Sequence, residues 1–157
     1  MKDINTNLTN KNKFRIFIHN DHGKELEFLV KDVNFGGSSI SVIQKPVRGI
    51  KQLKIPGSTI EHSDISIDFY INEDWTVYKN LYKWLMEIHD QQEIGEDNMP
   101  MKNMTIEALD SKFKVVQVIN CIYCFPNAIS AFSMSTEDDA EPLMGHVDFT
   151  CNGYIFS

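Results

Sequence analysis

The hydrophobic pattern of the chain is mainly that of β-strands, because apolar residues recur at every second position in several segments. The clearest run is Ile65, Ile67, Phe69 and Ile71. Residues 13–31 carry two such runs on either side of Gly23 and are predicted to form a β-hairpin. Further strands are expected at residues 104–108, 113–122, 129–134 and 147–156.

One segment has helical periodicity instead. Its apolar residues recur at spacings of three and four: Val77, Leu81, Trp84, Leu85 and Ile88. Asn72 is expected to be the N-cap, with Glu73 and Asp74 in the first turn, where the helix dipole favours negative charge. The pattern therefore predicts an amphipathic helix over about residues 73–89 that covers one side of a sheet.

Between these elements lies a long segment with little core of its own, from about residue 35 to residue 63. Glycines and prolines interrupt it, and residues 38–44 alternate only weakly. A segment of this length is usually functional or becomes ordered against a partner, and a mobile surface loop is the alternative. Its apolar residues would need burial against that partner. The predicted interface residues are Phe35, Gly36, Ile50, Leu53, Ile55, Pro56 and Ile60.

Length and composition limit the classes of protein that fit this chain. Its 157 residues fit one domain, 1–157, which can bury about two thirds of its unfolded surface without disulfides. The net charge of −7 argues against binding nucleic acid by neutralising phosphates. No stretch approaches the roughly 20 apolar residues of a membrane span, and residues 1–12 contain no apolar signal core. We therefore expect a protein that is made in a cytoplasm and not exported by a signal peptide.

The cysteines are one candidate for chemistry, because Cys121 and Cys124 have the spacing of a redox pair or of half a zinc site. They lie in a β-prone run, 115–125, that is expected to end at Pro126, and side chains three apart in a strand point to opposite faces. Structural thiols are therefore favoured, and a small zinc- or thiol-dependent module is the competing alternative. The residues left to complete a zinc site have no familiar ligand spacing: Cys151, His19, His22, His62, His89 and His146.

No other motif indicates catalysis. The sequence contains no glycine-rich phosphate loop, no nucleophile elbow and no His-Glu pair on a helix. The acidic run Glu137, Asp138 and Asp139 is more typical of a solvated turn than of a metal cage, because no calcium-loop spacing accompanies it. We therefore predict no catalytic residue, no cofactor and no bound metal.

Together these elements predict a mainly β fold, an antiparallel barrel or sandwich of about seven strands with one flanking helix and a long hairpin-like arm. Their order resembles the tail-tube proteins of contractile-tailed (T4-like) bacteriophages over nearly the whole chain. The segments that carry the resemblance are 12–16, 31–37, 55–57, 65–69, 81–85, 120–126 and 147–150, with Tyr154.

The resemblance implies a structural virion protein whose barrels form hexameric rings, which stack into a conduit for genome ejection. It implies as partners further copies of the chain, the tail sheath, the baseplate tube initiator and the tail terminator. Genome DNA would pass through the lumen without sequence-specific binding. The protein would be assembled in the host cytoplasm and lie in the phage tail. A tube initiator of the same fold and the tube protein of a bacterial contractile injection system are the alternatives.

Overall fold

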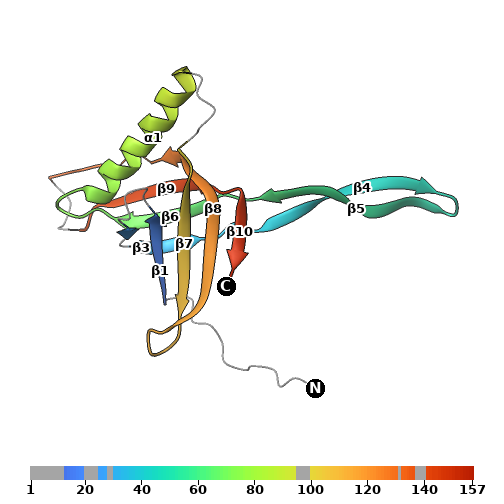
Figure 1. The fold of residues 1–157 in the computed structure, drawn as a ribbon, viewed down its shortest axis with the longest axis horizontal. Helices are drawn as coiled ribbons and strands as arrows, with labels where there is room; N and C mark the ends of the chain where they lie inside the picture. Colours follow the sequence, from blue (N-terminus) through green and yellow to red (C-terminus); the bar gives the residue numbers. More distant parts are fainter. Residues whose placement is uncertain (1–12, 20–24, 28–29, 95–99, 131, 137–140) are drawn as a thin grey trace.

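The computed structural model describes residues 13–19, 25–27, 30–94, 100–130, 132–136 and 141–157 (Figure 1). This part of the chain contains ten strands and one helix. Two of the strands form the predicted arm, and the other eight correspond to the expected barrel or sandwich of about seven strands. The strands are β1 Phe14–His19, β2 Glu25–Glu27, β3 Val30–Asn34, β4 Ser38–Val47, β5 Ile50–His62, β6 Ile65–Tyr70, β7 Lys102–Leu109, β8 Val115–Ile129, β9 Met144–Thr150 and β10 Gly153–Phe156. The helix α1 spans Thr76–Ile94.

Eight of the strands form one antiparallel sheet in the order β2-β1-β7-β8-β9-β6-β3, with β10 also paired to β8. The remaining two, β4 and β5, pair only with each other and form a separate ribbon. The sheet is strongly bent: β3, β6 and β9 cross the direction of β1, β7 and β10, and α1 lies over one end (Figure 1). The predicted mainly β fold with one helix and a long arm is confirmed.

Strand β8 joins the two parts of the sheet, since it pairs with β7 and β10 along its first part and with β9 from Phe125 to Ile129. The prediction that this strand ends at Pro126 is therefore wrong. A proline lacks the N–H group of a regular ladder and is tolerated at bulges. The register of β8 against β9 shifts between Pro126 and Ala128, so Pro126 lies at a bulge or similar irregularity. At this point β8 turns from one part of the sheet to the other (Figure 1).

A second irregularity in β8 places two cysteines on the same face. Lys102 and Met104 of β7 face Cys124 and Cys121, so one residue of β7 opposes two of β8, and Tyr123 has a φ of 51°. This bulge adds one residue to the alternation. Both thiols consequently point into the core, and the expectation of opposite faces is wrong.

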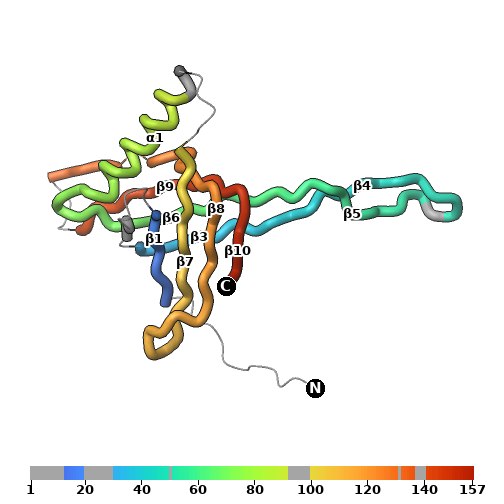
Figure 2. Tube along the Cα trace, in the orientation of Figure 1, coloured from blue at the N-terminus to red at the C-terminus, as the bar shows by residue number. Residues whose placement is uncertain are grey.

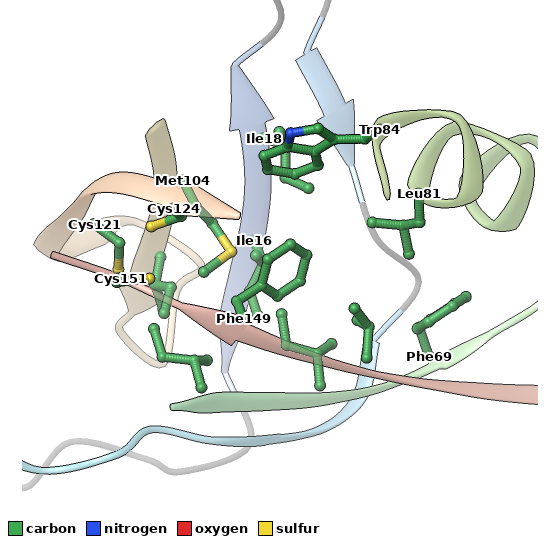
Figure 3. Packing of buried hydrophobic residues seen from close by; sticks show 14 of the residues in the cluster. Ile16, Ile18, Phe69, Leu81, Trp84, Met104, Cys121, Cys124, Phe149 and Cys151 are labelled. Atoms are coloured by element: carbon green, nitrogen blue, oxygen red, sulfur yellow. The ribbon is translucent and has the colours of Figure 1, made fainter. Parts of the chain in front are cut away.

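The core lies inside the bend of the sheet and beneath α1 (Figure 3). Strand β6 shows the alternation predicted for it, with every second side chain fully buried. On the helix, Leu81 and Trp84 close the core, and the Trp84 ring centroid lies 5.8 Å from that of Phe149. Further buried core residues are Ile16, Ile18, Ile65, Ile67, Phe69, Val77, Met104, Ile106, Val147 and Cys151.

The helix begins later than its sequence predicted. Trp75 has a φ of 59°, which a right-handed helix excludes, so α1 starts at Thr76 and not near residue 73. Asp74 accepts a hydrogen bond of 3.1 Å from the Thr76 amide. Hydrogen bonding with the Thr76 side chain, and then with this amide, lowers the pKa of the Asp74 carboxyl. Asp74 therefore caps the helix in place of Asn72. Glu73 and Asp74, which were predicted to lie in the first turn, both precede the helix. At the other end α1 continues to Ile94, beyond the expected residue 89.

Three further predictions need correction or qualification. The hairpin predicted at 13–31 exists as β1 and β2, but Val30 belongs to β3, which pairs with β6. The strand expected at 129–134 does not form in the described residues after Ile129, because β8 ends there. The closing strand is interrupted at Cys151 and Asn152, where the chain leaves β9 and returns to β8 as β10. His22 and residues 137–139 lie outside the described residues.

Gly145 of β9 gives a test of how tightly this core is packed. It pairs with Phe69, and a Cβ atom at position 145 would lie 2.7 Å from the Phe69 ring. We expect Gly145→Ala to lower the free energy of unfolding by about 1–3 kcal/mol through overpacking, measured by urea denaturation. Gly37→Ala is the matched control, because a Cβ atom there meets nothing within 4 Å. Equal midpoints for both variants would show that Phe69 can move aside.

Candidate assembly interface

The ribbon of β4 and β5, which we call the arm, projects from the rest of the chain well beyond the sheet (Figures 1 and 2). Every residue of β4 is exposed, and most of β5 is as well. Its large apolar side chains are nevertheless numerous: Ile40, Val42, Ile43, Val47, Leu53 and Ile60 have exposed fractions of 41–61%. A two-stranded ribbon alone in water is only marginally stable. The arm therefore presents a large apolar surface to solvent.

The register of the outer arm separates its side chains into two faces. Ile43 pairs with Ile55 and Lys45 with Leu53, so these side chains share one face, and Val47 follows on the same side. We call this face the apolar stripe: Ile43, Val47, Leu53 and Ile55, with Lys45 among them. The opposite face carries Val42, Gln44, Lys54 and Pro56.

The seven predicted interface residues fall in three places. Leu53 and Ile55 belong to the apolar stripe, and Pro56 lies on the opposite face. Ile60 is 61% exposed nearer the sheet, whereas Phe35 and Gly36 lie at the point where the arm leaves it. Ile50 begins β5 and pairs with Val47, but its side chain lies outside the described residues.

Sequence reasoning missed the apolar residues of β4 that complete this surface. They are Ile40, Val42, Ile43 and Val47. The available signal was the weak alternation over residues 38–44, which covers Ile40, Val42 and Ile43 but not Val47. The arm forms a hairpin over most of the segment predicted at about 35–63.

Tyr154 of β10 holds the base of the arm. Its ring centroid lies 4.7 Å from that of Phe35 and 4.8 Å from that of His62. Phe35 lies just before β4 and His62 at the end of β5, so Tyr154 contacts both segments at the base of the arm. The Tyr154 hydroxyl donates a 3.2 Å hydrogen bond to the Ser63 carbonyl, and burial raises the pKa of this phenol, so it remains a donor at neutral pH. Across the base, Ser38 Oγ and His62 Nδ1 form a 2.7 Å hydrogen bond. These contacts fix where the arm emerges.

Two glycines allow the close approaches on which this geometry depends. A Cβ atom at Gly36 would lie 2.5 Å from the Asp64 carbonyl oxygen, and one at Gly57 would lie 2.1 Å from Ser41 Oγ. Ser41 Oγ accepts a 3.3 Å hydrogen bond from the Thr59 amide at the same irregularity of the ribbon. Any larger residue at Gly36 would therefore push this segment away from Ser63 and Asp64, at the other side of the arm's base.

The junction between β5 and β6 is held by Asp64. Its carboxylate accepts a 2.8 Å hydrogen bond from Asn127 Nδ2 and a 3.1 Å hydrogen bond from Thr150 Oγ1. Asn127 also donates to Thr150 Oγ1 at 2.8 Å. The end of the arm is thereby tied to β8 and β9 as well as to β10.

Beside this junction, the outer faces of β6 and β9 carry a histidine between two aspartates. His146 Nδ1 donates to Asp68, and Nε2 donates to Asp148 Oδ1 at 3.0 Å. Ser66 Oγ donates to the same Asp148 oxygen at 2.6 Å. The hydrogen bond to Asp68 and the charge of Asp148 raise the pKa of His146 above its ordinary value of 6.5. The arrangement is that of an imidazolium bridging two strands.

The three cysteines gather in the core (Figure 3), and Met104 of β7 pairs with Cys121 of β8. Hydrogen bonding to Cys121 and burial raise the pKa of Cys124, and they raise that of Cys151 to about 12, which keeps these two groups as neutral thiols. Within the described residues, no three His, Cys, Asp or Glu side chains are arranged to hold a metal ion. No helix of that part of the chain is long and apolar enough to cross a bilayer.

The sheet also ends in strands with an unpaired edge. Among the described strands, β2 and β3 stand at the two ends of the order, and β10 pairs with β8 alone. Strand β10 additionally exposes Ile155 and Phe156, at 51% and 64%. An unpaired edge with exposed apolar side chains is a template for pairing with another chain. The molecule thus offers two kinds of contact surface, the arm and the strand edges.

Removal of the Tyr154 ring should loosen the base of the arm. We expect Tyr154→Ala to speed amide hydrogen exchange at residues 37–40 and 60–63 by about tenfold, since two ring contacts are worth roughly 0.5–1.5 kcal/mol each. Tyr154→Phe keeps both contacts and loses only the hydroxyl, so it should exchange much more like the unaltered protein. Unchanged exchange in the alanine variant would show that Tyr154 does not hold the arm.

The His146 bridge predicts a pH dependence of stability. Because the folded pKa is raised, the stabilisation is fully present below the unfolded pKa of about 6.5 and is lost as the pH rises through the folded value. The effect should stay below about 1 kcal/mol, since the pairs are partly exposed and screened. Urea unfolding from pH 6 to 9 should show this loss for the unaltered chain and not for His146→Gln. Parallel curves for the two proteins would contradict a charged bridge.

Comparison with known proteins places this geometry in context. A sequence profile described as phage tail tube protein matches residues 3–157, and no curated protein matches the sequence. Among solved structures, the chain is similar to one in the extended PVC sheath–tube complex of an extracellular contractile injection system, with 13% identity, a TM-score of 0.69 and coverage of 97% of this chain and 93% of that one.

Two other structures show the same fold. A chain of the anti-feeding prophage (AFP) baseplate has 9% identity and a TM-score of 0.73, with 98% of this chain and 97% of that one covered. The Hcp1 protein from E. coli EAEC 042 has 11% identity and a TM-score of 0.55, with 92% and 97% covered. At such identities the likeness concerns the fold, and the profile match over nearly the full sequence carries the assignment. The chain belongs to the phage tail tube protein family.

Proposed function

We propose that this protein is the main tail tube subunit of a contractile phage tail, and that its copies form hexameric rings that stack into the conduit for genome ejection. The observation that carries the proposal is the arm. It is firmly tied at its base by Tyr154 and Asp64, yet it presents exposed apolar side chains far from the sheet. A ribbon of this kind is stabilised when it lies against another copy.

Within a ring, we propose that neighbouring subunits pair through the unpaired edges of the sheet. Strand β10 supplies one such edge, and β3 supplies another at the end of the strand order. Backbone hydrogen bonds between edges need no special sequence motif. This division assigns the strand edges to contacts within a ring and the arm to contacts between rings, with Phe35, Gly36, Ile50, Leu53, Ile55, Pro56 and Ile60 as the predicted arm interface.

The proposed partners follow from the same role. They are further copies of the chain, the tail sheath, the baseplate tube initiator and the tail terminator, within a virion assembled in the host cytoplasm. Similar chains occur in structures described as a sheath–tube complex, a sheath/tube terminator and a baseplate. Genome DNA would pass the tube without specific binding, which the net charge of −7 favours. The protein would have a structural and not an enzymatic role.

A second candidate is the tube protein of a bacterial contractile injection system. It is supported by the likeness to structures of extracellular contractile injection systems, with TM-scores of 0.69 and 0.70. A baseplate tube initiator with the same fold is the third candidate, and the AFP baseplate chain supports it. Assembly behaviour distinguishes them, since an initiator would not stack into long tubes by itself.

The direct experiment is negative-stain electron microscopy of the purified protein over a range of concentrations, with light scattering for mass. We expect rings with a central hole that stack at high concentration. The double variant Leu53→Asp and Ile55→Asp should form rings but stack at a critical concentration at least about tenfold higher, because two buried apolar contacts per subunit are lost.

The control is the double variant Val115→Asp and Val116→Asp, which changes two exposed apolar residues of β8 away from the arm. Circular dichroism of each variant checks that the sheet still folds. Tubes of the arm variant that grow like those of the unaltered chain would contradict the role of the arm. A protein that remains monomeric, even with a baseplate seed, would contradict the tube function itself.

A further inference from the structure

The charges of this chain are strongly segregated. Residues 38–60 contain four basic residues, Lys45, Arg48, Lys51 and Lys54, and no acidic residue. Since the whole sequence has 15 basic and 22 acidic residues, the remainder has 15 − 4 = 11 basic against 22 acidic. Residues 38–60, which are the arm without Glu61 and His62 at its base, therefore carry a net charge of +4, and the remainder of the chain carries −11. A chain that is acidic overall has one basic projection.

The basic residues lie where the arm is farthest from its own sheet. All four are exposed and occupy the outer part of the ribbon, around the turn between β4 and β5. Lys45 lies on the same face as the apolar stripe, and Lys54 lies on the opposite face beside Pro56. In the described part of the chain, none of the four forms an ion pair with a carboxylate. The positive charge is thus presented outward together with the apolar stripe.

Exposed carboxylates, in contrast, are distributed over the rest of the described chain. They include Asp32, Glu73, Asp74, Glu87, Asp90 and Glu141. Opposite charge on two parts of one molecule favours contact between the basic part of one copy and the acidic part of the next. It disfavours contact between two arms or between two acidic bodies.

We propose that the arm docks electrostatically as well as through its apolar stripe, and that its receptor is the acidic surface of a second copy of this chain. The inference rests on the proposed tube function and adds to it the chemistry of the inter-ring contact. The apolar stripe supplies burial, and the four cations direct the arm to the acidic part of the next copy, since that contact brings the +4 of residues 38–60 against a part of net charge −11. Contact between two arms would bring like charges together.

Nucleic acid is the other partner that a basic ribbon could attract, but the chain disfavours it. Residues 38–60 contain no aromatic residue, so the arm has no platform on which bases could stack. A net charge of −11 on the remainder of the chain would repel phosphates at the same time. The exposed apolar side chains of the stripe are instead typical of a surface that packs against another protein.

The test is a charge reversal that keeps the four apolar side chains of the stripe. The arm variant is Lys45→Glu with Lys51→Glu, and the control is Lys83→Glu with Lys112→Glu, which makes the same charge change at exposed positions of α1 and of the turn before β8. Stacking of rings is measured by light scattering and electron microscopy at about 0.05 M and about 0.5 M sodium chloride, because the higher salt shortens the screening length severalfold.

We expect the unaltered protein to stack more readily at low salt than at high salt. At low salt the arm variant should need at least about a tenfold higher concentration, whereas the control should need less than about threefold. The difference between the arm variant and the unaltered protein should shrink at high salt. Both variants should keep the circular dichroism spectrum and the thermal midpoint of the sheet.

Three results would overturn the proposal. The arm variant could stack like the unaltered protein, or stacking could be equally strong at both salt concentrations, which would leave the apolar stripe as the whole contact. Alternatively, the unaltered protein could shift a labelled DNA duplex in a gel while the arm variant does not, which would make DNA the partner of the arm. Failure of the tube function is distinguishable from these, because the unaltered protein would then form no rings at all.

Discussion

The bend of β8 is the constraint on which the rest of the structure depends. Of the strands in the described part, β8 alone pairs with members of both crossing parts of the sheet: β7 and β10 belong to one part, and β9 belongs to the other. Its irregularities at Tyr123 and Pro126 allow one strand to serve both. The bend encloses the core, and the space that it creates is closed by Leu81 and Trp84 of the helix. Without it the chain would form two open sheets, each with an exposed apolar face.

The bulge at Tyr123 is stabilised by side chains from both neighbouring segments. The Tyr123 amide donates to Asn103 Oδ1 at 3.3 Å, and Asn152 Nδ2 donates to the Tyr123 carbonyl at 2.7 Å. Asn152 lies in the break between β9 and β10, so the same residue supports the bulge and directs β10 back along β8. Tyr154 follows two residues later and reaches the base of the arm. The orientation of the arm thus depends, through β10, on the geometry of β8.

The sequence was sufficient for the elements whose burial is regular. The alternation from Ile65 to Ile71 predicted β6. The glycines and prolines within residues 35–63 indicated a segment with little core of its own, and this segment forms the arm. The start of α1 could not be predicted, because it depends on the left-handed conformation of Trp75, whose ring packs against Tyr78 and Phe132. The same holds for the cysteines: a bulge changes which side chains share a face, and nothing local in the sequence marks it. Contacts between segments distant in the chain decided both cases.

The arm is continuous with the sheet, since β5 passes through only Ser63 and Asp64 before it becomes β6, and both run in the same direction (Figure 1). A pull or push along the arm is therefore transmitted along the axis of a buried strand. The ladder hydrogen bonds that join β6 to β3 and β9 lie across that axis. Such a load acts on all of them together in shear, instead of opening them one at a time from an end. The attachment of the arm is consequently mechanically strong in the direction in which it points.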